Sequence, residues 1–279
     1  MTDDDLSFLA QLVRRRSGLV LPPHKSGLIE GRLAPVMRRF GFRTVEALIQ
    51  DLRHGRDTLA RAVTEAMMTN ESSFFRDRAA FEQFREIVLP PLLESRASSK
   101  RLRIWCAACA AGQEAYSVAM LLDDLKLQAA GWNIDLIATD FSAEMIARAE
   151  EGVYSHFEAQ RGLAIRRLVA NFTQEGGSWR IHERLRRMVT FRQFNLLDSY
   201  GWLDDLDAVF CRNVLIYFER KTKIEVLDKI AEILLPDGAL ILGHAESVRG
   251  LSEEFVPVDH APTIFVKGKA AAQRLAAVG

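Results

Sequence analysis

Residues 103–117 read RIWCAACAAGQEAYS, and this stretch decides the fold of the larger part of the chain. An apolar run that passes through small residues into a polar helix start is typical of a strand, a tight turn and a helix. Such a turn lets a ligand approach the backbone at the carboxyl edge of a parallel sheet. The stretch lacks the full G-x-G-x-x-G pattern of dinucleotide sites, which favours a ligand without a pyrophosphate.

Similar apolar runs recur along the rest of the chain and alternate with amphipathic segments. This alternation predicts an α/β fold, with a parallel sheet covered by helices. We expect strands at 102–106, 134–139, 208–211 and 239–242 and helices at 113–127, 143–151 and 220–235, the last closed by Pro236-Asp237-Gly238. The interval 172–194 contains Gly176-Gly177 and predicts a small inserted hairpin.

The first 68 residues predict a separate helical module. Apolar residues recur there at helical spacing, and no segment is convincing as a strand. Gly41 is expected to stop the second helix, and Thr44 to cap the third. A later helix over 81–88 is expected to end at Pro90-Pro91 and to lead into a polar linker at 95–100.

Composition describes a globular chain. The 279 residues carry 37 basic and 37 acidic side chains and are 48% hydrophobic, which excludes disordered and fibrous classes. Apolar runs fall far short of the roughly 18 residues that cross a bilayer. The acidic start of the chain is unlike a secretory signal, and the cysteine count, 3, fits a reducing compartment. We therefore expect a cytoplasmic protein with no membrane insertion.

A carboxylate ends the second predicted strand. Asp140 follows the apolar run 134–139, where a ribose diol could donate two hydrogen bonds to it. It could equally cap the helix at 143–151, a role for which Ser142 competes. Both interpretations of Asp140 stay open at this point.

Further polar residues follow other strands at the same edge. Arg212 and Asn213 come directly after the strand at 208–211, and Tyr217 lies four residues later. Tyr217 is either a cleft residue or a core aromatic with its hydroxyl at the surface. Asn195 could bind an adenine edge or cap a strand.

Several motifs occur in a specific order along the chain: TNESSFFR at 69–76, the stretch 103–117, ATD at 138–140, NLL at 195–197, FCRNVLIYF at 210–218, PDG at 236–238 and GHAES at 243–247. In this order they resemble the chemotaxis receptor glutamate methyltransferases of the CheR family. The resemblance covers nearly the whole chain, and the combination is specific where any one motif would not be.

The resemblance implies a fold and an activity. It implies an all-α receptor-recognition domain at 1–68, an interdomain linker and helix at 69–100 that contribute to the cofactor site, and a Rossmann-like S-adenosylmethionine-dependent methyltransferase domain at 101–279 with a small β subdomain inserted at about 172–191. The implied reaction moves a methyl group from S-adenosylmethionine to receptor glutamates. Its products would be glutamate methyl esters and S-adenosylhomocysteine.

The family pattern also carries over to individual positions. It implies cofactor contacts at Asn70, Ser72, Arg76, Glu114, Asp140, Asn195, Leu196, Asn213 and Val214, with Asp140 on the ribose. Ser72 stands where threonine is usual, and it keeps the hydroxyl. Gln113 precedes Glu114 where relatives usually carry two acidic residues, and we expect cofactor binding to survive because Glu114 remains. The insert is short around 174–179, which predicts receptor binding without a C-terminal peptide tether.

The chemistry asks for positioning rather than for a base. A methyl sulfonium is already activated and a glutamate side chain is ionised near pH 7, so a general base is not required. Orientation and exclusion of water can supply the rate. Arg76 is predicted to hold the substrate carboxylate and Tyr217 to fix its geometry, as the catalytic pair. The alternative for Arg76 is a surface salt bridge with Asp77 or Glu82.

The helical module is basic. From Leu6 to Ala62 there are eleven Lys or Arg and four acidic residues. This excess predicts an acidic partner, in line with the acidic methylation helices that the resemblance implies. The alternatives are a solvated helical surface and nucleic acid, but zinc-finger spacing and interleaved aromatics are missing. We expect no nucleic-acid partner and a monomeric protein.

Other motifs are weaker. Cys106 and Cys109 form a lone C-x-x-C that predicts buried packing residues rather than a zinc site, and His244 and His260 lack partners at metal spacing. We therefore expect no metal site. Two rival functions remain: a methyltransferase of another protein or of a small molecule, and a non-catalytic signalling adaptor.

Overall fold

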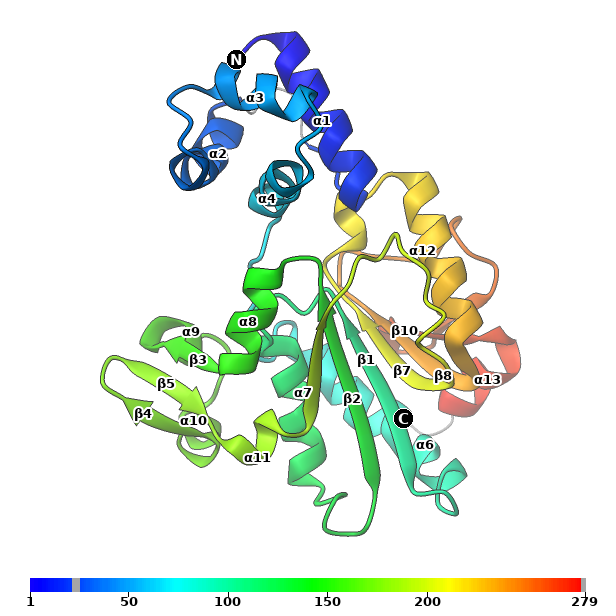
Figure 1. Ribbon diagram of the computed structural model, residues 1–279. Coiled ribbons are helices and arrows are strands. Elements are labelled where there is room, and N and C mark those ends of the chain that lie inside the picture. The colour runs from blue at the N-terminus through cyan, green and yellow to red at the C-terminus, as the bar shows by residue number, and fades with distance from the viewer. Residues whose placement is uncertain (22–25, 277–279) are drawn as a thin grey trace. The chain divides into compact units, whose positions relative to one another are not determined.

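The computed structural model describes residues 1–21 and 26–276 and divides the chain into two compact units (Figure 1). The first unit is Met1–Thr69 together with Tyr217–Thr222. The second is Asn70–Ile216 together with the chain from Lys223 onward. Within the described residues, no helix has the length and apolar character that a membrane span requires.

The first unit is helical. Its helices are α1 (Asp3–Ser17), α2 (Ser26–Phe40), α3 (Val45–Arg53) and α4 (Asp57–Met67). Local signals set their ends: the Thr2 hydroxyl accepts a hydrogen bond from the Asp5 amide at 3.2 Å, and the Asp5 carboxylate accepts one from the Thr2 amide at 3.0 Å. The predicted cap of α3 is confirmed, because the Thr44 hydroxyl accepts from the Ala47 amide at 3.2 Å. Gly41 follows α2 with a φ of +78°, as a helix stop requires.

The core of the helical unit includes a segment from far along the chain. Its buried side chains include Leu9, Val13, Leu33, Leu48, Leu59 and Val63. The 217–222 segment joins them: the Val20 amide donates to the Tyr217 carbonyl at 2.9 Å, and Arg14 pairs with Glu219 at 2.7 Å. The helical unit is therefore more than the contiguous first 68 residues.

The second unit is built on a seven-stranded sheet among the described residues, in the order β6-β2-β1-β7-β8-β10-β9. The strands are β1 (Arg101–Ala107), β2 (Asn133–Asp140), β6 (Val189–Gln193), β7 (Leu206–Cys211), β8 (Leu234–Leu242), β9 (Phe255–Val258) and β10 (Ala261–Lys267). The pairs from β6 to β8 are parallel, and β10 is antiparallel to both of its neighbours. The predicted parallel sheet and its four strands are confirmed.

Helices bury both faces of this sheet. They include α7 (Gln113–Asp124), α8 (Ala143–Glu151), α12 (Arg220–Ile233) and α13 (Gly268–Ala276), and Figure 1 shows α12 in front of the sheet. Ile104 and Cys106 of β1 belong to a core that includes residues of α7. Trp105 between them is fully buried, and its ring centroid lies 6.2 Å from that of Phe194 and 5.3 Å from that of Tyr200. A strand buried on both faces explains why β1 is apolar without interruption from Ile104 to Ala107.

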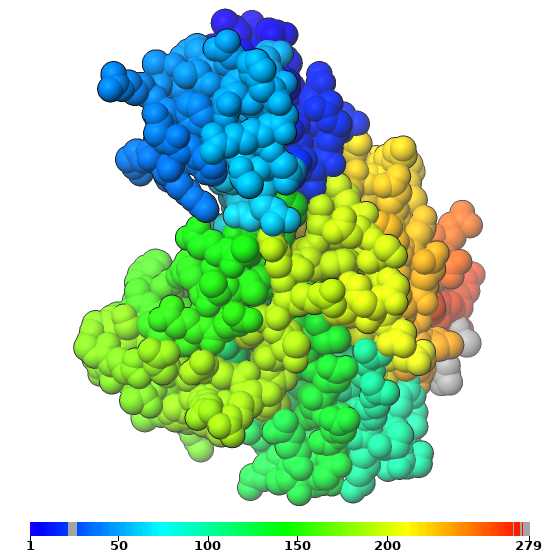
Figure 2. Space-filling view, viewed as in Figure 1, coloured from blue at the N-terminus to red at the C-terminus, as the bar shows by residue number. Residues whose placement is uncertain are grey.

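A three-stranded antiparallel sheet, β3-β5-β4, forms a lobe at one side of the second unit (Figures 1 and 2). It consists of β3 (Val153–Ser155), β4 (Phe172–Glu175) and β5 (Ser178–Ile181), with α9 (His156–Gln160) and α10 (Ile165–Asn171) between β3 and β4. The expected hairpin is β4–β5, but the expected limits of about 172–191 need correction. The insert starts at β3, and after α11 (Glu183–Arg186) the chain enters β6, which pairs with β2 of the main sheet. A three-residue strand leaves too short a period-2 pattern to be seen in the sequence.

The segment 70–100 belongs to the core of the second unit. It forms α5 (Arg78–Gln83), a π-helical turn η1 (Phe84–Val88) and α6 (Leu89–Ser95). The helix does not end at Pro90-Pro91 as expected, because the two prolines occupy the first turn of α6, where amides lack an intrahelical partner. The segment 95–100, expected to be a linker, is bonded to the second unit: Arg96 pairs with Asp207 at 2.9 Å and with Asp237 at 2.6 Å.

Pro236-Asp237-Gly238 does not close the helix before it. The helix α12 ends at Ile233, and the three residues lie inside β8, beside a register shift in the β7–β8 pairing. Gly238 is required there because a Cβ would lie 2.9 Å from the Leu234 side chain.

Candidate functional site

The carboxyl ends of the parallel strands gather a set of loops at one edge of the second unit. The strands β1, β2, β6, β7 and β8 end at Ala107, Asp140, Gln193, Cys211 and Leu242. The chain builds the sheet outward from β1 through β2 to β6, and then returns to the other side of β1 with β7. Open α/β sheets bind ligands at such a switch point, outside the carboxyl ends of the strands.

The turn after β1 is tight and is tied to β2. Ala108, Ala110 and Gly112 all have positive φ values, of 58°, 49° and 88°. At Gly112 a Cβ would lie 2.9 Å from the Ala149 side chain, so only glycine fits without displacement. The Cys109 amide donates to the backbone carbonyl of Thr139 at 2.8 Å. Small residues thus bring backbone close to the edge where a ligand would lie.

Asp140 joins two of the edge loops. Its carboxylate accepts hydrogen bonds from the Ala110 amide at 2.8 Å and from the Ser142 amide at 2.9 Å. The cap of α8 is Ser142, whose hydroxyl accepts from the Met145 amide at 3.3 Å. A carboxylate has lone pairs for about four hydrogen bonds, which is more than these two backbone amides use. The ribose contact stays a prediction.

Glu114 lies in a buried ion-pair cluster that sequence reasoning did not anticipate. Arg212 donates to Glu114 at 2.8 Å, to Asp77 at 2.9 Å and to the Arg76 carbonyl at 2.7 Å. Glu114 and Arg212 are 8% and 4% exposed, so this is a desolvated pair. Burial raises the pKa of the Glu114 carboxyl above its ordinary value, and the attraction of Arg212 opposes that rise. The signal was present: an arginine inside the apolar run FCRNVLIYF must be paired if it is buried.

Glu246 organises the loop after β7. Its carboxylate accepts four backbone hydrogen bonds, from Asn213 at 2.7 Å, Gly243 at 2.8 Å, Val214 at 3.0 Å and Ile216 at 3.2 Å. Asn213 has a φ of +57°, and a Cβ at Gly243 would lie 2.7 Å from both the Asn213 and the Glu246 side chains. Asn213 and Val214 are therefore held at the edge by their amides. Sequence reasoning named Glu246 only as part of the GHAES motif.

Asn195 and Leu196 follow β6 at the same edge. The Asn195 side-chain oxygen accepts from the Leu197 amide at 3.1 Å. Leu196 is buried, and its carbonyl accepts from the Tyr200 hydroxyl at 3.1 Å. Their predicted cofactor contacts stay predictions.

The segment 70–77 is anchored by its backbone. The Phe75 amide donates to the Ser117 hydroxyl of α7 at 2.9 Å, and the Arg76 carbonyl accepts from Arg212. Asn70 is exposed and Ser72 is half-buried in the stretch that leads to Arg76. The Arg76 guanidinium donates to the Glu71 carbonyl at 2.9 Å. Asp77, one of the two residues considered as an alternative salt-bridge partner of Arg76, pairs with Arg212.

Tyr217 lies in the first unit, half-buried against the helical core. Arg76 lies in the second unit. Their pairing as catalytic residues stays a prediction.

The cysteines are free and buried. Burial raises the pKa of Cys106, Cys109 and Cys211 well above that of an ordinary thiol. Among the residues that the structure describes, no group of three or more His, Cys, Asp or Glu is placed to hold a metal ion.

Comparisons with known proteins agree with this arrangement. Residues 4–68 match the family described as CheR methyltransferase, all-alpha domain, and residues 70–264 match CheR methyltransferase, SAM binding domain. The chain is 37% identical over 269 residues to chemotaxis protein methyltransferase 1 of Pseudomonas aeruginosa, with 95% of this chain and 98% of that protein covered. It is 36% identical over 270 residues to chemotaxis protein methyltransferase Cher2 of Pseudomonas putida, with the same coverage.

These matches span both units and join an all-α domain to an S-adenosylmethionine-binding α/β domain, as the resemblance implied. The chain therefore belongs to the CheR family of S-adenosylmethionine-dependent methyltransferases.

Proposed function

We propose that this enzyme transfers the methyl group of S-adenosylmethionine to glutamate side-chain carboxylates of chemotaxis receptors. The observation that carries the proposal is family membership over both units, with relatives named as chemotaxis protein methyltransferases that match nearly end to end. The products would be glutamate methyl esters and S-adenosylhomocysteine. The buried free cysteines suit a cytoplasmic enzyme in a reducing compartment.

The edge of the second unit suits the cofactor. It combines a turn of small residues with carboxylates at Glu114 and Asp140 and lacks a phosphate-binding glycine pattern. The Gln113 side-chain oxygen in the same turn is buried and accepts no hydrogen bond within the described residues, so a donor from a bound ligand could satisfy it. We propose contacts from Asn70, Ser72, Arg76, Glu114, Asp140, Asn195, Leu196, Asn213 and Val214.

The reaction asks the protein to position its substrate. When bound, S-adenosylmethionine supplies a methyl group on a sulfonium that needs no further activation. The substrate glutamate is ionised near neutral pH, so the residues of the chain need not remove a proton. Arg76 would orient that carboxylate through its planar guanidinium, and Tyr217 would assist with a neutral hydroxyl. Because the Arg76 backbone is fixed by the buried Arg212, the guanidinium projects from a rigid base.

The basic helical unit would bind the acidic methylation helices of the receptor. Arg15, Arg38, Arg43 and Arg61 are exposed and have no carboxylate partner in the described part of the chain. Arg38→Glu with Arg43→Glu should lower kcat/KM for receptor about tenfold or more at low salt, and the loss should shrink as salt screens the charges. Affinity for S-adenosylhomocysteine should not change, which separates substrate docking from cofactor binding.

Transfer of radiolabelled methyl to receptor-containing membranes tests the reaction. We expect label on the receptor that base releases, as an ester requires, and about a hundredfold or greater loss in Arg76→Ala. Arg166→Ala is the matched control, since Arg166 is an exposed arginine of α10 that is not among the proposed site residues. Absence of label from an enzyme that binds S-adenosylhomocysteine would point to another substrate or to an adaptor.

A thermodynamic cycle can assign Asp140. If the Asp140 carboxylate contacts the ribose, the wild type should bind a deoxyribose analogue about tenfold or more weakly than S-adenosylhomocysteine itself. The Asp140→Asn substitution should then reduce the affinity for the analogue only a little further. If Asp140 only holds the turn at Ala110, the Asp140→Asn substitution should reduce the affinity for the analogue and for S-adenosylhomocysteine by the same factor.

The inserted lobe bears on how the receptor is reached. The strands β4 and β5 are four residues each and turn at Gly176-Gly177. We propose that such a short hairpin leaves receptor binding independent of a C-terminal peptide tether. A pulldown that showed micromolar binding of an aromatic and acidic receptor tail would contradict this.

A further inference from the structure

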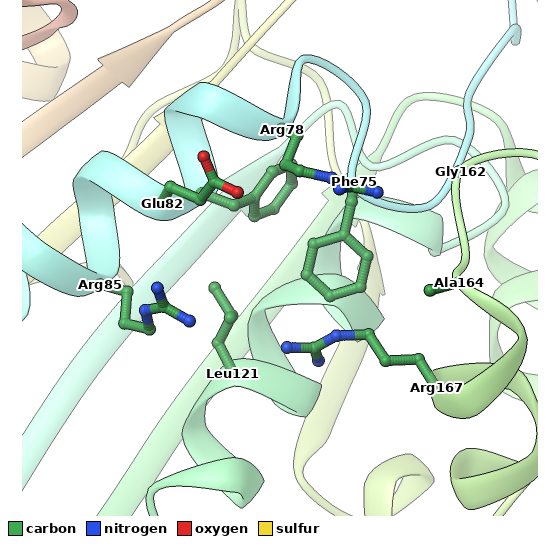
Figure 3. A pocket seen from close by; sticks show the side chains of 9 residues that line it. Phe75, Arg78, Glu82, Arg85, Leu121, Gly162, Ala164 and Arg167 are labelled. Carbon is green, nitrogen blue, oxygen red and sulfur yellow. The ribbon is translucent and has the colours of Figure 1, made fainter.

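A pocket lies in the second unit between α5–η1, α7 and the chain that leads into α10 (Figure 3). Its volume is about 140 Å³. It is lined by Phe75, Arg78, Phe81, Glu82, Arg85, Leu121, Gly162, Ala164 and Arg167. None of these lining residues is among the proposed cofactor contacts, so the pocket is a separate candidate site.

The pocket is rich in arginine, and two of its three arginines already pair with carboxylates outside the lining, Arg85 with Glu86 and Arg167 with Asp124. Three arginines, Arg78, Arg85 and Arg167, line it with one carboxylate, Glu82, and Figure 3 shows the guanidiniums of Arg85 and Arg167 reaching inward from opposite sides. Arg78 is exposed and has no ion-pair partner among the described residues. Even with Glu82 ionised, the lining carries two more positive than negative charges.

Arg167 has an unsatisfied donor. Its Nη2 pairs with Asp124 at 2.8 Å, whereas its Nη1 is buried and has no hydrogen-bond partner in the described part of the chain. A buried guanidinium nitrogen without an acceptor is energetically unfavourable. An anion in the pocket would supply an acceptor beside Arg167, whose guanidinium reaches into the cavity (Figure 3).

The rest of the lining is apolar. The rings of Phe75 and Phe81 and the side chain of Leu121 line the cavity beside the arginines. The Arg167 guanidinium lies 4.7 Å from the centroid of the Phe75 ring, which holds it in place. An arginine-rich end beside aromatic rings suits a ligand with a compact anion joined to a flat apolar group.

We propose that this pocket binds a small phosphate monoester that carries an aromatic or other flat apolar group. A phosphate monoester carries about −1.5 to −2 charges near neutral pH and presents three acceptor oxygens, which match the excess charge and several guanidinium donors. A carboxylate would satisfy the charge only in part. Arg78 also favours phosphate because its guanidinium can form a forked pair with two phosphate oxygens, and Arg85 and Arg167 would add the nitrogens that their pairs with Glu86 and Asp124 leave over.

The pocket wall requires a glycine. Gly162 has a φ of +95°, and a Cβ there would lie 1.8 Å from the Phe74 carbonyl oxygen. The loop before α10 therefore packs directly on the backbone that precedes Phe75. This contact fixes the distance between Arg167 of α10 and the arginines of α5–η1, so the site is formed before a ligand arrives.

Phenyl phosphate is the probe, measured by isothermal titration calorimetry against the full chain at low salt. We expect binding about tenfold or more tighter than that of inorganic phosphate, and no binding of phenol, because both the anion and the ring contribute. Saturation with S-adenosylhomocysteine should leave the affinity unchanged. Displacement by that ligand would place the phosphate at the cofactor edge and overturn the proposal.

The variants separate a built site from general attraction to a basic protein. Arg78→Ala should weaken phenyl phosphate about tenfold, and Arg167→Gln should weaken it at least as much. Arg166→Ala, on the exposed face of the same α10, should bind as the wild type does. Binding of S-adenosylhomocysteine reports that each variant is folded, and Arg78 is exposed, so its loss should not unfold the chain. Equal weakening in Arg78→Ala and Arg166→Ala, or equal affinity for phenyl phosphate and inorganic phosphate, would overturn the site.

Discussion

Removal of Arg212 is the perturbation that the structure defines most sharply. Arg212→Met keeps a long unbranched side chain but removes three charge-assisted hydrogen bonds, to Glu114, to Asp77 and to the Arg76 carbonyl. The Arg212 and Glu114 side chains are 1% and 11% exposed, whereas that of Asp77 is 39% exposed. The energetic consequence is therefore dominated by Glu114, which stays buried without its counter-charge.

The expected loss is large. Removing one partner of a buried ion pair costs about 3–5 kcal/mol, because the remaining charge is left uncompensated. The exposed pair with Asp77 adds roughly 0–1 kcal/mol. We expect Arg212→Met to lower the free energy of unfolding by about 3–5 kcal/mol. The double variant Glu114→Gln with Arg212→Met should lose less stability than the sum of the two single variants, by at least ~1 kcal/mol, because the two residues interact.

The same pair predicts a pH dependence with a definite sign. Burial already raises the pKa of Glu114, and without Arg212 it should rise further above the unfolded value. Between these two pKa values the folded state binds more protons than the unfolded state, so the stability of Arg212→Met falls as pH rises through that window. The loss should therefore be smaller at about pH 5 than at about pH 8, and Glu114→Gln should abolish the difference.

Urea unfolding at the two pH values measures all of these quantities, with affinity for S-adenosylhomocysteine as a second readout. Arg166→Met is the matched control and should change stability by less than ~0.5 kcal/mol. Additive losses in the double variant, or a loss from Arg212→Met that grows toward low pH, would refute the buried-pair argument.

Three further predictions follow from other contacts. Glu246→Gln should lower stability by about 2–4 kcal/mol in urea unfolding and weaken S-adenosylhomocysteine in calorimetry, because an amide cannot accept all four backbone hydrogen bonds. Gly162→Ala, whose Cβ would lie 1.8 Å from a backbone carbonyl oxygen, should lower Tm by several degrees in scanning calorimetry, whereas Gly177→Ala, with nothing within 4 Å, should not. The Arg96 guanidinium holds the pKa of Asp237 below its usual value, so Asp237→Asn should be less stable than the wild type at neutral pH; that difference should vanish as pH falls through the folded pKa, which urea unfolding down to about pH 3 can follow.

The sequence predicted what local patterns encode. The helix at 143–151 was predicted to the residue, because Ser142 caps it and Gly152 ends it in a left-handed conformation. The parallel strands β1, β2, β7 and β8 were visible because burial makes most of their residues apolar. The parallel strand β6 was instead assigned to the inserted hairpin, since its residues Thr190, Arg192 and Gln193 are polar. The continuation of the helix through Pro90-Pro91 was missed, since it depends on a π-helical turn that places the prolines at a helix start.

Partners far apart in the sequence could not be predicted in this way. Arg212, Glu114 and Asp77 lie in three separate parts of the sequence, and Arg212 donates to both carboxylates. The 217–222 segment belongs to the helical unit although it follows a strand of the sheet. No periodicity carries such information. The rule that a buried charge must be paired applies to Arg212, but it does not identify the partner.

Asp140, Glu114 and Glu246, the carboxylates at this edge of the second unit, each make structural contacts that explain their positions. Asp140 ties the turn after β1 to the start of α8, and Glu246 gathers the amides of Asn213 and Val214. Glu114 neutralises Arg212, which in turn fixes the Arg76 carbonyl. Arg76 is thus held by its main chain, while its guanidinium donates to the neutral backbone carbonyl of Glu71. If Arg76 orients the substrate glutamate as we propose, that carboxylate would replace the neutral Glu71 carbonyl as its acceptor, because a charged acceptor forms the stronger bond.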